Sequence, residues 1–369
     1  MTSKKVKKIL YMGCYGNAIH RNIIFINGLK KNEIDVIEYN VKSHNIFKNL
    51  IAFFKNFKRL KKQNFELILF HSEAFIQFYL AKILALIKRI PLIHDIFISK
   101  LQTIYDDRKQ FEKRKIPKIL LRIILFTTDL IECSFSDYLI LDTYSHIKFF
   151  HEKFKTPLKK FRKVLVGSMN NIFYPIENEK DKKEKFLIGF AGTFIPLQGV
   201  EYIIEAAKIL ENNNQIIFHF IGDGQTYRDN KKLAEELKIK NIIFFGRVPL
   251  INVREMISKC DVKLGIFGNT PKALQVIPTK VFDGMAMKKP MISADTPAIR
   301  ELFTNNENIL LCEIANPKSL AEAILKLKKD KILREKIAEN AYTLYKKYCT
   351  LDVIGKRLIQ VFNGILNKK

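Results

Sequence analysis

Short apolar segments alternate with longer helical segments along most of this chain, and the alternation restarts halfway. Apolar strands separated by helices are typical of parallel sheets that helices cover on both faces. The strands expected in the first half are Lys8–Met12, Asp35–Tyr39, Leu67–His71, Pro91–Asp95 and Tyr138–Asp142. Those expected in the second half are Phe186–Ala191, Ile216–Gly222, Ile242–Gly246, Val262–Ile266, Pro290–Ser293 and Asn308–Leu311. The two series predict an α/β chain with two Rossmann-like, doubly wound parallel-sheet domains.

The length of 369 residues is sufficient for two domains with separate cores. Between the two series, residues 164–185 are polar, charged and poor in apolar side chains, which is typical of a linker. We therefore expect an N-terminal Rossmann-like domain over 1–170, a linker over 171–185 and a C-terminal Rossmann-like domain over 186–345. Residues 346–369 are expected to be helical.

Basic residues exceed acidic ones throughout the chain, with 64 Lys and Arg against 37 Asp and Glu. The resulting net charge of +27 is uneven, because residues 1–170 account for +18 of it. A polyanionic partner, an anionic membrane surface or an acidic substrate fits this excess. Compositional drift toward Lys, Asn and Ile fits it as well, although drift alone leaves the uneven distribution unexplained. With 47% hydrophobic residues, the composition excludes disordered and fibrous proteins.

The five cysteines share no close spacing, so neither a disulfide framework nor a zinc site is indicated. This pattern favours a reducing compartment. The basic and apolar start of the chain is too short for a signal peptide and is better interpreted as a first strand. No uninterrupted run of 18 apolar residues occurs, so we expect no transmembrane helix and a cytoplasmic location.

Glycine-containing turns follow several of the predicted strands, where open α/β sheets bind their ligands. These turns are Gly13–Asn17, Gly192–Gly199, Ile221–Gly224 and Phe245–Pro249. Glycine lets backbone N–H groups approach a phosphate at the start of the next helix. Each turn by itself is equally an ordinary loop. Four turns at equivalent positions favour a nucleotide ligand.

The segment Leu264–Ser293 places a polar loop between a strand and a helix that Pro278 and Thr279 begin. Lys280 would add a full charge to the helix N-terminus, which attracts anions through its free N–H groups and dipole. Asp283 follows three residues later and could accept hydrogen bonds from sugar hydroxyls. A diphosphate beside a hydroxylated ring suits this arrangement.

These motifs resemble the retaining glycosyltransferases of family 4, which have the GT-B fold. In the second half the resemblance covers about 160 residues, and its motifs occur in the family's order and spacing. They are Phe190–Thr193, Gln198–Ala207, Phe220–Gly224, Phe244–Pro249 and Pro278–Ala286, followed by Lys289-Pro290. In the first half Pro91–Ser99, Tyr105–Arg108 and Val166–Pro175 look like one branch of the family.

The resemblance implies that a hexosyl group moves from a UDP- or GDP-sugar to a lipid-linked or saccharide acceptor with its anomeric configuration kept. It implies no cofactor and no metal, two domains facing a central cleft, and a C-terminal helix that packs back on the N-terminal domain. The pathway that the resemblance implies is cell-surface polysaccharide or glycolipid synthesis. It also implies a peripheral location on the cytoplasmic face of the inner membrane. The donor-binding positions carried over are Gly13, Gly16, Gly192, Thr193, Gln198, Gly222, Gly224, Arg247, Val248, Lys272, Thr279 and Asp283.

Two departures from the family pattern affect the predicted chemistry. Where the family has two glutamates eight positions apart, this chain has Gln275 and Asp283, so a charge near the donor sugar is lost. Where many members have basic residues in the glycine loop, this chain has Gln198. A departing diphosphate needs a cation, and Lys280 is our first candidate, ahead of Arg247 and Lys272.

His94 and Asp95 end a strand of the first series, and in the family this strand end approaches the acceptor or the donor sugar. We predict catalytic roles for His94, Asp95, Lys280 and Gln275. His94 could donate to the sugar and Asp95 could orient the acceptor hydroxyl. A histidine that simply bonds backbone at a strand end is equally consistent with the sequence.

Two segments of the first half, Asn45–Lys62 and Lys109–Phe126, are both apolar and basic. In the first, Ile46, Leu50, Phe53, Phe54 and Phe57 share one helical face and lysines occupy the other. Such helices could lie on an anionic membrane or pack against the sheet.

Two other functions remain possible from the sequence. A catalytically weakened relative that only binds nucleotide sugar would explain Gln198 and Gln275. A nucleic-acid binder would explain the charge, but no nucleic-acid motif is present and the basic residues are scattered. We therefore expect no nucleic-acid partner.

Overall fold

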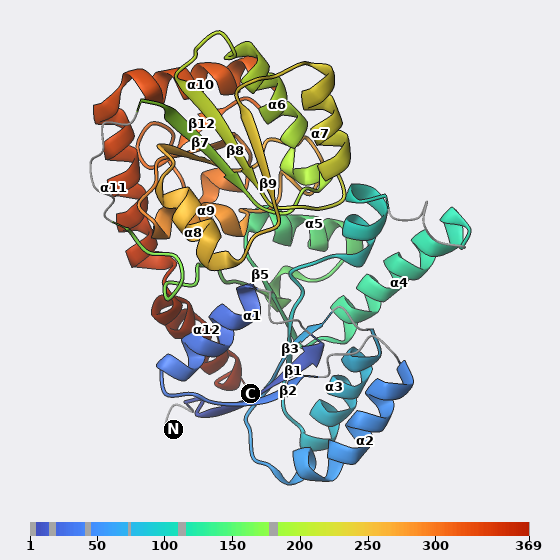
Figure 1. Cartoon of the computed structure of the whole chain (residues 1–369). Helices are drawn as coiled ribbons and strands as arrows, with labels where there is room; N and C mark the ends of the chain where they lie inside the picture. Colours follow the sequence, from blue (N-terminus) through green and yellow to red (C-terminus); the bar gives the residue numbers. More distant parts are fainter. Residues whose placement is uncertain are drawn as a thin grey trace. The chain divides into compact units, whose positions relative to one another are not determined.

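The computed structural model describes six stretches of the chain, residues 5–14, 20–40, 46–72, 75–109, 116–176 and 184–368. These residues form two compact units. The first unit comprises residues 1–105, 110–166 and 351–369, and the second comprises 106–109 and 167–350. Each unit is a parallel sheet with helices around it (Figure 1).

The first unit contains a six-stranded parallel sheet with the order β2-β1-β3-β4-β5-β6. Its strands are β1 (Lys8–Cys14), β2 (Asp35–Asn40), β3 (Ile68–Ser72), β4 (Leu92–Asp95), β5 (Tyr138–Leu141) and β6 (Phe161–Lys163). The five strands predicted for this half are confirmed. The sequence analysis missed β6, because its three residues include two cations and show no apolar run.

Helices cover this first sheet in two groups, as Figure 1 shows. The helices are α1 (His20–Lys31), α2 (Ile46–Lys62), α3 (Phe75–Lys88), α4 (Lys118–Phe135), α5 (Tyr144–Phe154) and α12 (Leu351–Leu366). The α1 helix packs along α12, while α3 contacts both α2 and α4. The π-helical turn η1 (Leu101–Asp107) precedes α4, and the short 3-10 turn η3 (Leu158–Lys160) precedes β6.

Two glycines allow α1 and α12 to approach closely. A Cβ at Gly355 would lie 2.1 Å from the carbonyl oxygen of Gly28, and one at Gly28 would lie 2.5 Å from that of Leu351. The Asn32 side chain donates to the carbonyl of Asp352, and the Asn363 side chain accepts from the N–H of Val6. The last helix is therefore an integral part of the first unit.

The predicted apolar face of α2 is divided in the structure. Phe53 is buried, and Leu50 and Phe57 pack against the same core. Phe54, predicted on this face, is instead 66% exposed, and the Ile46 side chain lies outside the described residues. The helix thus packs against the sheet and also leaves apolar side chains on the surface.

The second unit contains a six-stranded parallel sheet with the order β12-β11-β10-β7-β8-β9. Its strands are β7 (Phe186–Ala191), β8 (Ile216–Ile221), β9 (Ile242–Gly246), β10 (Val262–Leu264), β11 (Met291–Ala294) and β12 (Leu310–Cys312). All six were predicted. The first strand, β7, lies between β8 and β10, so the chain order reverses there, and open α/β sheets bind ligands at such switch points.

The helices of the second unit also form two groups (Figure 1). They are α6 (Val200–Ile209), α7 (Tyr227–Glu236), α8 (Leu250–Ser258), α9 (Thr279–Ala286), α10 (Pro317–Lys329) and α11 (Lys331–Tyr348). The α6 helix contacts α7 and α10, whereas α9 contacts α11. The helix start predicted at Pro278 and Thr279 is confirmed, because α9 begins at Thr279. The α10 helix begins at Pro317, with Asn316 as its N-cap.

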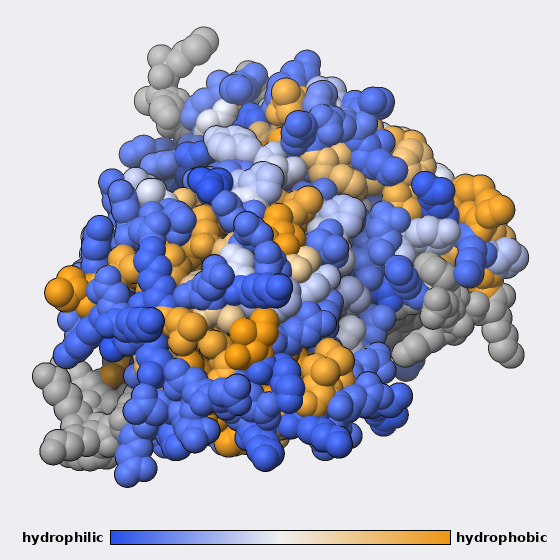
Figure 2. Space-filling model, turned by 90° about the horizontal axis from the view of Figure 1, so that it is seen from above, coloured by the Kyte–Doolittle hydropathy of each residue, from blue (hydrophilic) through white to orange (hydrophobic). Residues whose placement is uncertain are grey.

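Hydrophilic side chains predominate on the face seen in Figure 2, where hydrophobic side chains emerge in separate groups. Among the described residues, no helix is both long and apolar enough to cross a membrane.

Candidate active site

The turns after β7 and β8 are locked together by backbone contacts. Gly222 has a φ of +131°, and a Cβ there would lie 2.0 Å from the carbonyl oxygen of Gly192. The N–H of Gly192 donates to Ile221 and that of Gly222 donates to Gly246, at 2.9 and 2.7 Å. These two N–H groups are therefore already engaged within the protein. Close backbone approach explains why glycine is required at position 222.

The next residues of the two turns repeat this arrangement. Gly224 has a φ of +157°, and a Cβ there would lie 2.4 Å from the carbonyl oxygen of Phe194. Its N–H donates to the carboxylate Oδ1 of the preceding residue, Asp223, at 2.7 Å. The N–H of Phe194 donates to the carbonyl of Asp223 at 3.0 Å, so the two turns are hydrogen-bonded to each other along this edge of the sheet. Thr193 lies in the middle of this edge and is exposed.

Lys280 reaches this edge from the first turn of α9. Its side chain is only 7% exposed, and its Nζ lies 3.6 Å from the centre of the Phe190 ring. A Cβ at position 192 would lie 2.7 Å from Nζ, so only glycine leaves room for the ammonium group. The Lys280 Nζ has no hydrogen-bond partner among the described residues.

Burial, and secondarily the charge of Lys263, lower the pKa of Lys280 well below its ordinary value. A buried cation without a hydrogen-bonded counter-ion is costly for the folded protein. Such a lysine at a sheet's switch point suits an anionic ligand, because the ligand's negative charge would raise the pKa that burial lowers.

Lys263 is a second buried cation of this site, and the sequence analysis missed it. It is the middle residue of β10 and is 2% exposed. Burial lowers the pKa of Lys263 to about 8, although the Asp283 carboxylate opposes this shift. The sequence did offer an indication, because a lysine within a buried strand of three residues needs a partner for its charge inside the protein.

Asp283 lies on α9 and is 5% exposed. The Ser168 hydroxyl donates to its Oδ1 at 2.6 Å. One carboxylate oxygen is therefore held within the second unit, and Lys263 neutralises part of its charge. The ribose contact predicted for Asp283 stays a prediction.

Gln198 lies in the glycine loop after β7 and is 7% exposed. Its side-chain Oε1 is buried and has no partner among the described residues. The loop is pinned by Gly199, which has a φ of +61° and where a Cβ would lie 2.3 Å from the N atom of Gly268. Gln198 thus has a free acceptor in a loop of fixed position, next to the strands β7 and β10.

The remaining predicted donor-binding residues of the second unit lie on two further segments. Arg247 is exposed and Val248 half-buried just after β9, which lies two strands, about 10 Å, from β7. Lys272 is buried and Gln275 is half-buried on the segment between β10 and α9. Thr279 is the first residue of α9. Their contacts with a donor stay predictions.

In the first unit, Asp95 is completely enclosed by its own partners. Its carboxylate accepts from the Arg21 side chain, with Oδ1 at 2.9 Å from Nη2, and Oδ2 lies 3.1 Å from Nδ1 of His71. Burial acts to raise the pKa of Asp95, but the Arg21 and His71 partners outweigh it and lower the pKa to about 2. Arg21 also donates to the carbonyl of Val164. This geometry indicates a fixed ion pair at the end of β4.

His94 is 2% exposed and packs against the rings of Phe70 and Phe78, at centroid distances of 5.0 and 5.5 Å. Burial, with the nearby Lys100 and His71, lowers the pKa of His94 well below its ordinary value. Its Nδ1 has no partner among the described residues. A neutral, enclosed imidazole is a poor general acid at neutral pH. The catalytic roles predicted for His94 and Asp95 are not tested by these contacts.

Gly13 lies within β1, where it pairs with Asn40 of β2 and His71 of β3. Gly16 lies outside the described residues. Within the described stretches, no group of three or more His, Cys, Asp or Glu side chains could hold a metal ion.

Comparisons with known proteins identify the second half of the chain. A family model described as glycosyl transferases group 1 matches residues 174–344. An uncharacterized glycosyltransferase of Methanocaldococcus jannaschii is 30% identical over 159 residues, which is 43% of each chain. The putative teichuronic acid biosynthesis glycosyltransferase TuaC of Bacillus subtilis is 26% identical over 156 residues, or 42% of this chain and 36% of TuaC. The alignments thus cover less than half of the length of these curated relatives.

The fold comparison extends over nearly the whole chain. The crystal structure of Anabaena HepE in complex with UDP-glucose superposes with a TM-score of 0.71 at 16% identity, covering 97% of this chain and 99% of HepE. With two six-stranded parallel sheets and this likeness, the chain has the GT-B fold. Residues 174–344 are thus similar to the group 1 glycosyltransferases.

Proposed function

We propose that this protein transfers a sugar from a nucleotide diphosphate sugar, a UDP- or GDP-sugar, to an acceptor hydroxyl. The observation that carries the proposal is the Lys280 ammonium group, which is buried against Gly192 at the switch point of the second sheet and has no hydrogen-bond partner in the described part of the chain. A diphosphate at this position would supply the missing negative charge. The likeness to a protein crystallised with UDP-glucose supports the same ligand class.

In the proposed reaction, the bond between the anomeric carbon and the diphosphate oxygen breaks, and its electron pair stays on that oxygen. Lys280 stabilises the developing charge, an effect worth about 2.7–4 kcal/mol for a preorganised donor. The acceptor hydroxyl oxygen forms the new bond on the same face of the sugar, and its proton passes to the departing diphosphate. The configuration of the anomeric carbon is therefore retained.

The sugar and the ribose would be held by neutral and acidic groups around this cation. Gln198 offers a buried side-chain oxygen that no described residue contacts by a hydrogen bond, and this oxygen is suited to a sugar hydroxyl. Asp283, whose Oδ1 accepts from the Ser168 hydroxyl, is assigned to the ribose, as the family resemblance implies. Gln275 is assigned to the donor sugar, as the family resemblance implies. We expect full activity in EDTA, since this scheme uses lysine in place of a metal ion.

The proposed acceptor is a saccharide or a lipid-linked saccharide in cell-surface polysaccharide or glycolipid synthesis. One relative is named for teichuronic acid biosynthesis, which supports a polysaccharide pathway. For a lipid-linked acceptor, the enzyme would work at the cytoplasmic face of a membrane as a peripheral protein.

Three helices of the first unit expose apolar side chains that support membrane contact. The large exposed hydrophobic residues are Phe47, Ile51 and Phe54 of α2, Ile83, Leu86 and Ile87 of α3, and Ile119, Leu120, Ile123 and Ile124 of α4. Phe47 and Ile119 are 75% and 76% exposed. The lysines of α2 would attract anionic lipid headgroups, and each would contribute about 1 kcal/mol to membrane binding.

Flotation with vesicles tests the membrane part of the proposal. Phe47→Gln/Ile119→Gln should reduce binding to phosphatidylglycerol vesicles at least about tenfold, since burying one such side chain contributes about 1.5–3 kcal/mol. Ile209→Gln/Ile332→Gln, which alters two exposed side chains of the second unit, should bind as the unmodified protein does. Equal binding by both double variants would contradict membrane contact through these helices.

The transfer itself is tested by incubation with UDP- and GDP-sugars and detection of released nucleotide diphosphate and sugar. Hydrolysis of one donor in the absence of acceptor would establish the donor, and mass spectrometry with saccharide acceptors would follow. If a nucleotide diphosphate binds and no donor is cleaved, Gln198 and Gln275 mark a catalytically weakened relative. If no nucleotide binds, the proposal is wrong.

A further inference from the structure

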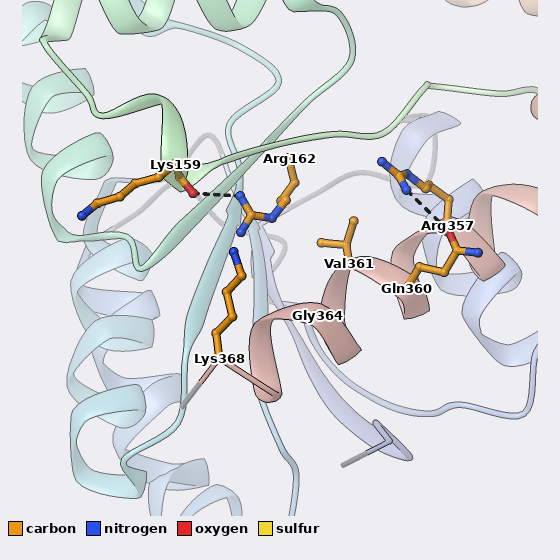
Figure 3. Close-up of a pocket in the computed structure, with 7 residues that line it drawn as sticks. All are labelled: Lys159, Arg162, Arg357, Gln360, Val361, Gly364 and Lys368. Carbon is orange, nitrogen blue, oxygen red and sulfur yellow. Dashed lines mark hydrogen bonds between the residues drawn. The ribbon is translucent and has the colours of Figure 1, made fainter. Parts of the chain in front are cut away.

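A basic pocket lies in the first unit, away from the strand ends at which such sheets bind their ligands. It has a volume of about 320 Å³ and seven lining residues, contributed by η3, β6, α12 and the residues that follow α12 (Figure 3). η3 leads into the amino end of β6, so the pocket is not at the carboxyl edge of the sheet. The volume is at the lower end of the range for small-molecule sites.

Four of the seven lining residues are cations, and none is acidic. The cations are Lys159, Arg162, Arg357 and Lys368. Within the described part of the chain, none of these four forms an ion pair, although α12 carries Asp352, which binds Lys356 instead. Like charges gathered without a counter-ion repel one another, and a bound anion would relieve this repulsion.

Arg162 is held in place by three contacts. Its Nη1 donates to the carbonyl oxygens of Lys159 and Phe161, at 2.8 and 2.7 Å, and its guanidinium lies 4.9 Å from the centre of the Tyr138 ring. Figure 3 shows the Lys368 ammonium pointing toward this guanidinium. A fixed guanidinium beside a lysine is well suited to an anion with several oxygens, such as a phosphate.

On the other side of the pocket, the Arg357 side chain donates to Oε1 of Gln360 at 3.4 Å. Both residues lie on one face of α12, and Val361 and Gly364 continue the lining between this pair and Lys368. The site therefore combines charged groups with an uncharged stretch, which leaves space for more than a bare ion.

We propose that this pocket binds a phosphate-bearing compound at a second site, independent of the sugar transfer proposed above. The phosphate would contact Arg162 and Lys368, and Arg357 would add long-range attraction. The phosphate could belong to a free metabolite or to the headgroup of an anionic lipid, and the chemistry of recognition is the same for both.

Because the chain contains no Trp, Tyr138→Trp would introduce a single fluorescent reporter under the Arg162 guanidinium. We would titrate this otherwise complete protein with inorganic diphosphate and with vesicles of phosphatidylglycerol or phosphatidylcholine. A saturable change with diphosphate is expected and would assign a soluble ligand. A change with phosphatidylglycerol vesicles alone would assign a lipid headgroup.

The matched variants carry the same loss of two charges. Arg357→Gln/Lys368→Gln in the reporter protein should weaken binding by at least about tenfold, because charge-assisted hydrogen bonds are the stronger ones. Lys31→Gln/Lys153→Gln removes two exposed cations of the same unit outside the pocket and should leave binding unchanged. Equal weakening by both double variants, or no response to either probe, would overturn the proposal.

Calorimetry of the protein with its natural Tyr138 provides a second measurement if the tryptophan does not fit. Lys280→Met would be included there, so that diphosphate binding in the second unit does not contribute. A heat of binding that the pocket variant loses and the control variant keeps is the expected result.

Discussion

Replacing Lys280 by methionine should stabilise the empty protein and weaken its binding of a nucleotide diphosphate. Methionine keeps most of the side-chain length and removes the charge. The Lys280 Nζ is buried against Phe190 and Gly192 and has no partner among the described residues. Removing an unsatisfied buried cation should therefore raise the free energy of unfolding, by about 1–3 kcal/mol.

The ligand effect should have the opposite sign. Loss of one charge-assisted contact costs about 1.5–3 kcal/mol, or a 10- to 150-fold increase in the Kd of UDP or GDP. At a ligand concentration of 100 Kd, the unmodified protein gains about 2.7 kcal/mol. If the Kd rises 100-fold, the same concentration contributes only about 0.4 kcal/mol.

Thermal unfolding with and without nucleotide measures both effects. For units of this size, 1 kcal/mol corresponds to about 2–4 °C, so the empty Lys280→Met protein should melt about 2–12 °C higher. Its nucleotide-induced shift should fall from several degrees to about one. Lys231→Met, an exposed lysine of α7, should change neither value. An unchanged nucleotide shift, or a lower melting temperature of the empty variant, would refute the reasoning.

Four further outcomes follow from the packing and the charges. Nucleotide diphosphate should bind more weakly as the pH rises through the lowered pKa of Lys280 toward about 10.5, since the complex requires the protonated amine. Calorimetry in buffers of different ionisation enthalpy should show proton uptake on binding. An affinity that does not change with pH would count against this role of Lys280. Arg21→Met should cost about 3–5 kcal/mol in urea unfolding, because it leaves Asp95 buried without its guanidinium. In the unmodified protein the ion pair of Asp95 contributes fully to folding stability above the unfolded-state pKa near 3.8, and this contribution should be lost as the pH falls toward about 2. The midpoint of acid unfolding should therefore shift in Asp95→Asn. Gly355→Ala should lower the free energy of unfolding by about 1–3 kcal/mol, because the alanine Cβ would overlap the carbonyl of Gly28. This loss should exceed the gain from the better helix propensity of alanine. A more stable variant would show that α1 and α12 can separate at no cost.

The sequence predicted the strands well because most inner strands are largely buried and therefore rich in apolar residues, whereas the edge strands β2 and β9 are partly exposed. Eleven of the twelve strands were expected, whereas β6 was missed. Its residues Phe161-Arg-Lys163 pair with β5 along the sheet edge, and an edge strand needs no apolar run. The helix start at Thr279 was also predicted, since proline is common where a helix begins.

The sequence also selected Lys280 as the cation of the candidate site, from its place at a helix start after a strand. It could not show that Nζ would be buried against Gly192 without a partner, because those residues are 88 positions apart and meet only through the order of the strands. The same holds for Lys263 and for the Ser168–Asp283 hydrogen bond.

Local patterns thus determined the two α/β series, the family motifs and the chemistry that these residues offer. Tertiary packing decided which groups remain available for a ligand. The N–H groups of Gly192 and Gly222 are used between neighbouring loops, Asp95 is paired with Arg21, and the Lys280 Nζ has no hydrogen-bond partner among the described residues. The physical reason is that hydrogen bonding and desolvation depend on neighbours that are distant along the chain, whereas strand and helix periodicity depends on residues that are close.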